Sequence, residues 1–184
     1  MERGKLRDYS GEFVPDITWD HFQRETLLEA LRLYSNLFLA IDGFWYLSIK
    51  ERFDDETAID RDLWVWDKYL RYETKRLTKF LNITGNDVEA FLKITQLSAW
   101  SGNIKFKTDL LAKNHCVVHV EHCPTLEALV REGKGREQYF CDTVDRAMFE
   151  MQARALNPEI SVRALRLPPA TIGGQVCCQW EIKL

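Results

Sequence analysis

The chain has 184 residues, of which 46% are hydrophobic, 12% aromatic and 29% charged. This mix is typical of a globular protein and excludes a disordered or fibrous chain, and the length suits one domain. A net charge of -3 without any long basic run argues against nucleic acid as a partner. No stretch reaches the ~18 uninterrupted apolar residues of a membrane span, and the first residues lack the apolar core of a signal peptide. We therefore expect no membrane partner and a cytoplasmic location.

The first half of the chain has the periodicity of helices. Apolar residues recur every three or four positions, which predicts helices at 20–52, 56–81 and 87–100. The run LFLAIDGFWYL in the first of them is apolar nearly all round. We expect that helix to be buried on most sides, with a kink at Gly43 and with Asp42 largely removed from water.

After Gly102 the apolar period changes from about 3.6 to 2, which is the period of strands. The alternation predicts four strands, at 103–111, 115–123, 159–167 and 175–184. Two helices, at 125–132 and 142–156, are expected between the second and third strands. The sequence thus predicts one α+β domain over residues 1–184, in which about three N-terminal helices (1–102) pack on a four-stranded antiparallel sheet (103–184) of order ββααββ.

All five cysteines lie in the last 70 or so residues, and their odd number argues against a secreted disulfide scaffold. Cys123 ends the second strand, Cys141 precedes a helix, and Cys178 is on the inward face of the last strand. These three elements can meet at one end of the sheet, where three thiolates would suit zinc or iron and His119 could be a nitrogen ligand. Their spacing is not a repeated CxxC, and the alternative is that they are small buried core residues.

Other side chains are candidates for catalysis or ligand binding. A thiolate at a helix N-terminus is stabilised by the helix dipole, which makes Cys141 a candidate nucleophile, with Asp42 or Glu121 as a base. Asp42 is also a candidate for ligand binding, together with three tryptophans of the helical half, Trp45, Trp66 and Trp100. The alternatives are hydrogen-bonded pairing for Asp42 and core packing for the tryptophans.

Several segments resemble a known protein family when they are taken in order. They are AIDGFWYLSIKERF, LWVWDKYLRYETKRL, CPTLEALVREG, YFCDTV, ALNPEISV, LPP and CQWEIKL. Over most of the chain they resemble an uncharacterised family of prokaryotic cytosolic proteins. The C-terminal part is also similar to the 4-vinyl reductase domain, a small-molecule-binding module in which cysteines can hold zinc, and more loosely to aminothiazoline-carboxylate hydrolases.

The resemblance implies that Cys123, Cys141 and Cys178 are motif positions. It also implies a further cysteine in the strand EISVRALRL, where this chain has Ala164 and Leu165. A fourth metal ligand would then come from His119 or from water.

Together these features favour a small-molecule-binding protein with an apolar aromatic pocket and a cysteine-ligated zinc or iron site, and they leave a homodimer open. The alternative is a hydrolase or another small-molecule enzyme that uses a cysteine nucleophile or a metal-activated water. No GxSxG, HExxH, P-loop or GxGxxG motif supports a named chemistry, so binding is the preferred interpretation.

Overall fold

A computed structural model of the chain describes residues 5–171 and 174–184. Its helices are α1 (Arg24–Arg52), α2 (Asp55–Phe80), α3 (Val88–Leu97), α4 (Pro124–Glu132) and α5 (Arg146–Leu156). Its strands are β1 (Lys105–Ala112), β2 (His115–His122), β3 (Ser161–Arg166) and β4 (Cys178–Lys183). Short 3₁₀ turns lie at Trp19–His21, Ala99–Ser101 and Arg136–Gln138, and a π-helical turn, Cys141–Asp145, leads into α5.

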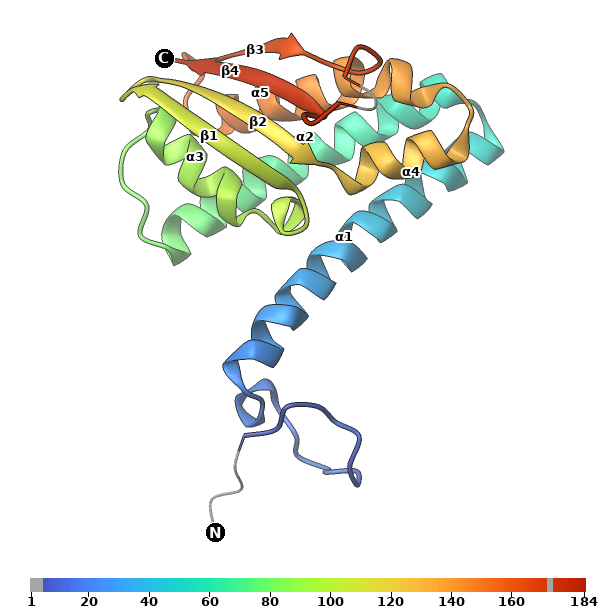
Figure 1. The fold of residues 1–184 in the computed structure, drawn as a ribbon, viewed down its shortest axis with the longest axis vertical. Coiled ribbons are helices and arrows are strands. Elements are labelled where there is room, and N and C mark those ends of the chain that lie inside the picture. Colours follow the sequence, from blue (N-terminus) through green and yellow to red (C-terminus); the bar gives the residue numbers. More distant parts are fainter. Residues whose placement is uncertain (1–4, 172–173) are drawn as a thin grey trace.

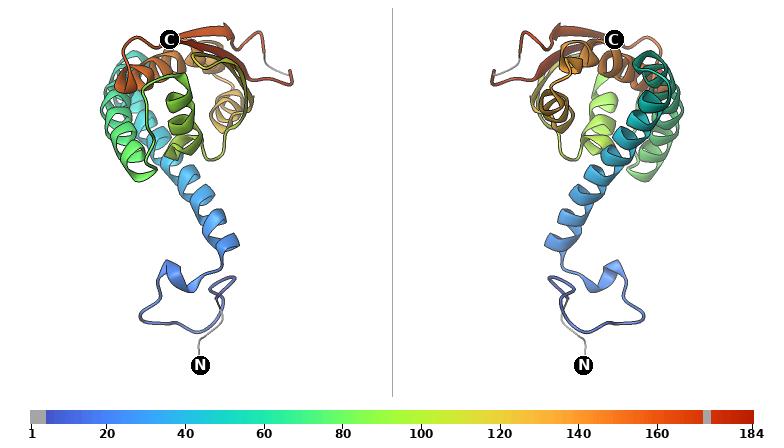
Figure 2. Two further views of the ribbon diagram at one scale, coloured as in Figure 1. Left: turned by 90° about the vertical axis from the view of Figure 1, so that its left-hand side faces the viewer. Right: turned by 90° about the vertical axis from the view of Figure 1, so that its right-hand side faces the viewer.

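The four strands form one antiparallel sheet in the order β1-β2-β4-β3. In Figures 1 and 2 the sheet lies at the top of the molecule with helices beneath one of its faces. The predicted α+β class with a four-stranded antiparallel sheet is therefore confirmed. The second hairpin inserts its last strand next to β2, so that β2 and β4 are the central strands and β1 and β3 the edges.

The two central strands owe their position to their alternating side chains. Cys116, Val118 and Val120 of β2 are all buried, whereas the residues between them point to the other face. On β4 the buried side chains are Cys178, Trp180 and Ile182, and Trp180 has no exposed surface at all. Because side chains alternate across a strand, each sequence pattern presents one apolar face to the helices.

Helix α2 supplies much of the opposite side of the core. Asp54 caps its N-terminus by accepting a hydrogen bond from the Thr57 amide at 2.7 Å. The buried stripe of α2 includes Trp66 and Leu70, which belong to the same apolar cluster as Trp180 and the other inward side chains of the sheet. The helical half and the sheet half of the chain therefore share one core.

Helix α1 differs from the expectation. It runs without a break through Gly43, and its N-terminal half projects away from the sheet and carries the N-terminal segment at its far end (Figures 1 and 2). Its attachment includes Ser35, whose hydroxyl donates to the Ala99 carbonyl at 2.5 Å, and the Asn103 amide, which donates to the Arg32 carbonyl at 2.8 Å. Most of the apolar side chains of α1 are exposed, so within one chain this helix is not buried on most sides.

Among the described helices, α1 included, none has the length and apolar character needed to cross a lipid bilayer.

Candidate functional site

A cavity of about 80 Å³ lies between α1, α2, the inner face of the sheet and the helical segment around α5. One water molecule needs roughly 10–15 Å³ of cavity volume, counted as the space open to the centre of a water-sized sphere. The cavity therefore has room for several waters or for a fragment of a small molecule. Its wall is mostly apolar and contains the predicted ligand-binding residues Trp66 and Trp100. The acidic and thiol side chains on the wall are Asp42, Asp62, Asp145, Cys123 and Cys178.

Asp42 of α1 and Asp62 of α2 form a carboxyl pair at the wall of this cavity. Asp62 is only 2% exposed, whereas Asp42 is half-buried. Of two more open grooves beside α1, Asp42 lines both and Asp62 lines one. Burial raises the pKa of both carboxyl groups, and the neighbouring Asp42 charge raises the pKa of Asp62 further. Hydrogen bonding from Trp66 acts in the opposite direction on both pKa values. The pair therefore holds a proton more tightly than two exposed carboxyl groups would.

Two buried polar atoms in the cavity wall have no hydrogen-bond partner within the described part of the chain. They are Oδ1 of Asp62 and Nε1 of Trp100, and Trp100 is only 7% exposed. A buried polar group without a partner costs about 1–3 kcal/mol, and most such groups in proteins are satisfied by protein, water or a ligand. One of these atoms is an acceptor and the other a donor, so the cavity can satisfy both types of group on a bound molecule.

The cysteines meet on another side of the cavity, around Asp145. The carboxyl group of Asp145 accepts a hydrogen bond from the Cys141 thiol, and its charge also raises the thiol pKa of Cys123 and of Cys178. Burial is the largest influence on all of these groups, and it raises the pKa of Asp145 itself to about 6. The structure thus brings the three predicted cysteines to one region, with an acidic side chain among them.

The local conformation explains why these thiols differ from the expectation of a reactive cysteine. Cys123 is the N-cap of α4, and its sulfur accepts from the Leu126 amide at 3.5 Å, but burial still raises its pKa to about 12. Cys141 does not occupy a free helix N-terminus, because Phe140 before it already has helical backbone angles. Burial and the charge of Asp145 raise the pKa of Cys141 far above that of an ordinary thiol. Both cysteines are therefore protonated at neutral pH, which is unfavourable for a nucleophile.

Three of the predicted site residues lie away from the cavity. His119 is on the outer face of the sheet, where its ring hydrogen-bonds to Asp109 and to Gln179, each at 2.9 Å. Glu121 is exposed and forms an ion pair with Lys107 at 2.5 Å. Trp45 is 54% exposed and lines a surface groove on α1 instead of the cavity. Alternation along β2 puts both His119 and Glu121 on the face opposite to Val118 and Val120, so neither side chain reaches the cysteines.

Two acidic residues of the cavity, Asp62 and Asp145, were not predicted from the sequence. Asp62 interrupts the buried stripe of α2 between Ala58 and Trp66, and this four-residue spacing was a usable signal. Asp145 could not be placed in the same way. It belongs to a π-helical turn, which adds a residue to the turn and changes which side chains face the interior.

A metal ion would need at least three suitable side chains arranged around one point. Among residues 5–171 and 174–184 there is no group of three His, Cys, Asp or Glu side chains positioned to hold one. The sulfur of Cys178 accepts a hydrogen bond from the Trp180 indole at 3.1 Å, and the Cys141 thiol lies beside the Asp145 carboxyl, which raises its pKa. As arranged here, the three cysteines do not fit a metal without rearrangement.

Comparison with known proteins gives one match. A model described as a family of unknown function (DUF6125) matches residues 20–184. No curated protein and no solved structure matches the chain. The comparisons therefore give no support to the similarity to the 4-vinyl reductase domain or to aminothiazoline-carboxylate hydrolases.

Proposed function

Since the chain belongs to this family of unknown function, we propose from the site alone that it binds a small, largely apolar molecule in the inner cavity. The observation that carries this proposal is the pair of unpartnered buried atoms, Oδ1 of Asp62 and Nε1 of Trp100, in a wall that is otherwise mostly apolar. A ligand with an apolar body and a polar end would satisfy both atoms and fill the space between the aromatic rings. This is the usual composition of a small-molecule site.

The carboxyl pair favours a ligand whose polar end can donate as well as accept a hydrogen bond. Asp62 is the buried member of the pair and lines one of the two more open grooves, whereas Asp42 is the more exposed member and lines both. A ligand that enters from a groove would meet Asp42 first and Asp62 at the inner end of its path. Asp42 is thus an entry residue in this proposal, and Trp66 lies beside the pair, where it lowers the pKa of both carboxyl groups.

Binding is favoured over cysteine chemistry because of the state of the thiols. Burial raises the pKa of Cys123, Cys141 and Cys178, and the Asp145 carboxyl lies among them. A cysteine nucleophile or a thiolate ligand set needs lowered thiol pKa values or a metal that displaces the protons. We therefore assign Cys123 and Cys178 to the cavity wall and Cys141 to the core, and zinc or iron binding becomes an outcome that the experiment must distinguish.

The direct test is native mass spectrometry of the purified protein, combined with elemental analysis for zinc and iron. The expected result is an added mass that is lost on denaturation and that contains no metal. Stoichiometric zinc or iron would instead identify a metal site at the cysteines. A chain that carries no added mass and does not bind 1-anilinonaphthalene-8-sulfonate, an apolar fluorescent probe, would contradict the proposal.

Variants locate the binding site within the molecule. Trp100→Phe removes the buried N–H and keeps most of the ring, so we expect weaker retention of the bound molecule with little change in stability. The matched control is Trp64→Phe, because Trp64 is 57% exposed and lies outside the cavity. Asp42→Asn should also weaken retention. Equal retention by Trp100→Phe and Trp64→Phe would place the bound molecule elsewhere.

A further inference from the structure

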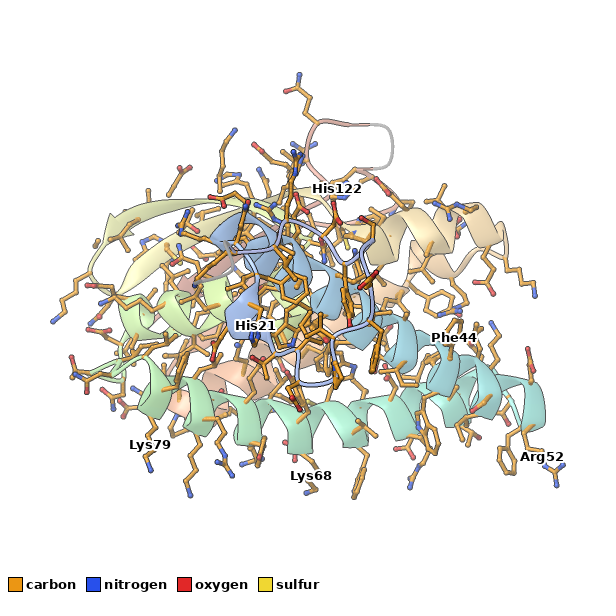
Figure 3. All side chains as sticks on the ribbon, turned by 90° about the horizontal axis from the view of Figure 1, so that it is seen from below. His21, Phe44, Arg52, Lys68, Lys79 and His122 are labelled. Carbon is orange, nitrogen blue, oxygen red and sulfur yellow. The ribbon has the colours of Figure 1, made fainter. Side chains whose placement is uncertain are left out.

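Seven large apolar side chains of helix α1 are more than half exposed, and six of them lie on one side of the helix. These six are Leu33, Tyr34, Leu37, Ile41, Phe44 and Trp45, each between 52% and 67% exposed. The seventh, Leu31, lies one turn before Ser35 on another side. We call the set of six the apolar α1 face. It lies on the opposite side of the helix from Ser35 and Tyr46, the two buried residues of α1. Phe44 is labelled on this helix in Figure 3.

The size of the apolar α1 face suits a stable protein interface. With more than half of each side chain exposed, the six together present on the order of 800 Å² of surface. A stable complex buries about 800 Å² on each partner, whereas the largest apolar patch of a monomer is usually about 300–600 Å². The face is therefore large for a surface that remains in water.

The positions of the six residues are symmetric along the helix. Residues 37 and 41 are each two positions from Leu39, residues 34 and 44 are five positions away, and residues 33 and 45 are six away. An antiparallel copy of the same helix, related by a two-fold axis near Leu39, thus places each of the six side chains at the same height along the helix pair as another of the six. Such self-complementarity is the requirement for a two-fold interface between identical chains.

We propose that a second copy of this chain packs its α1 antiparallel on the apolar α1 face. The antiparallel arrangement keeps the two sheets at opposite ends of the helix pair, so that the projecting half of one α1 lies beside the attached half of the other (Figure 1). A lipid surface suits the face less well, because interfacial helices on anionic membranes are rich in Lys and Arg. Helix α1 has four basic and four acidic residues: Arg24, Arg32, Lys50 and Arg52, and Glu25, Glu29, Asp42 and Glu51.

The second copy would also cover part of the ligand path. A surface groove between α1 and α2, lined by Ile41, Phe44, Trp45 and Tyr69 among others, reaches Asp42. Ile41, Phe44 and Trp45 belong to the apolar α1 face, so pairing of the helices closes this groove. The proposal rests on the helix face and not on ligand binding, and it holds whether or not the inner cavity is occupied.

Analytical ultracentrifugation of the full chain tests the assembly. We expect a monomer–dimer equilibrium, and Ile41→Glu should raise the dissociation constant about 100-fold or more, because it places two charges in the middle of the interface. The matched control is Leu111→Glu on β1, since Leu111 is similarly exposed, at 60% against 64% for Ile41. Circular dichroism should show both variants folded. A wild-type chain that is monomeric at every concentration, or a dimer that Ile41→Glu leaves intact, would overturn the proposal.

Cross-linking tests the direction of the helices. In the antiparallel pair position 37 of one chain faces position 41 of the other, so the double variant Leu37→Cys, Ile41→Cys should form a covalent dimer on mild oxidation. Each single variant should not, because positions 37 and 37 are displaced by about four residues, or about 6 Å, along the axis. Efficient cross-linking of the single Leu37→Cys variant would indicate parallel helices. Sedimentation of the protein with anionic vesicles would assign the face to a membrane, and either result contradicts the antiparallel dimer.

Discussion

Replacing Asp62 by Asn should change how the stability of the protein depends on pH. Asp62 is 2% exposed, its Oδ1 has no hydrogen-bond partner in the described residues, and it lies beside Asp42. Burial and the charge of Asp42 raise its pKa from an ordinary 3.8 to about 8. The native state therefore binds this proton more tightly than the unfolded state does.

The sign and size of the effect follow from proton linkage. Where the native state holds more protons, the free energy of unfolding falls as pH rises, so the contribution is complete below about pH 4 and is lost as the pH rises toward 8. One pKa unit is worth about 1.4 kcal/mol, so the full difference would be about 6 kcal/mol. Because Asp42 shares the proton and is half-exposed to water, we expect about half of this, ~3 kcal/mol.

The measurement is urea unfolding of wild type and Asp62→Asn between pH 5 and pH 8, followed by tryptophan fluorescence and circular dichroism. The free energy of unfolding of the variant should fall less than that of the wild type over this range, by about 2–3 kcal/mol. Asp60→Asn, on the same helix but exposed, should keep the wild-type pH dependence. Parallel curves for wild type and Asp62→Asn would show that the buried carboxyl does not hold its proton and would refute the reasoning.

Three further predictions concern other parts of the molecule. Dithionitrobenzoate should react rapidly with at most one thiol of the native protein at pH 8, that of half-buried Cys177, and with all five after unfolding. The reason is that the other four cysteines are buried and their thiol pKa values are raised. Rapid reaction of two or more native thiols would contradict this. Gly102→Ala should lower the free energy of unfolding by about 1–3 kcal/mol, measured by urea unfolding, since an added Cβ would lie 2.8 Å from the Ser35 side chain. Asp54→Ala should lower it by about 1 kcal/mol through loss of the cap on α2, whereas Asp60→Ala should have little effect.

The secondary structure and the faces of single elements could largely be read from the sequence. The two-residue alternation of the last strand identified Cys178 as inward-facing, and it is buried. The period of α2 likewise identified Trp66, which is 3% exposed. These features are local, because the direction of a side chain within a helix or strand depends only on its position along that element.

The site depended on contacts between elements that are far apart in the chain. Asp42 meets Asp62 because α1 and α2 pack side by side, and Asp145 joins the cysteines because a π-helical turn alters the facing of residues before α5. The periodicity of one segment carries no information about which distant segment will pack against it. The same is true of His119, a plausible ligand in the sequence that the pleat of β2 directs to the outer face.

Helix α1 shows most clearly which features follow from the sequence and which depend on the tertiary structure. Its composition by itself determined a helix with apolar residues on nearly every side; the helix was predicted over 20–52 and forms over Arg24–Arg52, after a separate 3₁₀ turn at Trp19–His21. Only the tertiary structure decided which side is covered: the side of Ser35 and Tyr46 contacts the rest of the chain, and the side of Ile41 and Phe44 stays in water. The physical reason is that the number of apolar residues determines how much surface a helix tends to bury, whereas the packing of distant segments determines what buries it. For the apolar α1 face, we propose that the covering surface is a second copy of the chain.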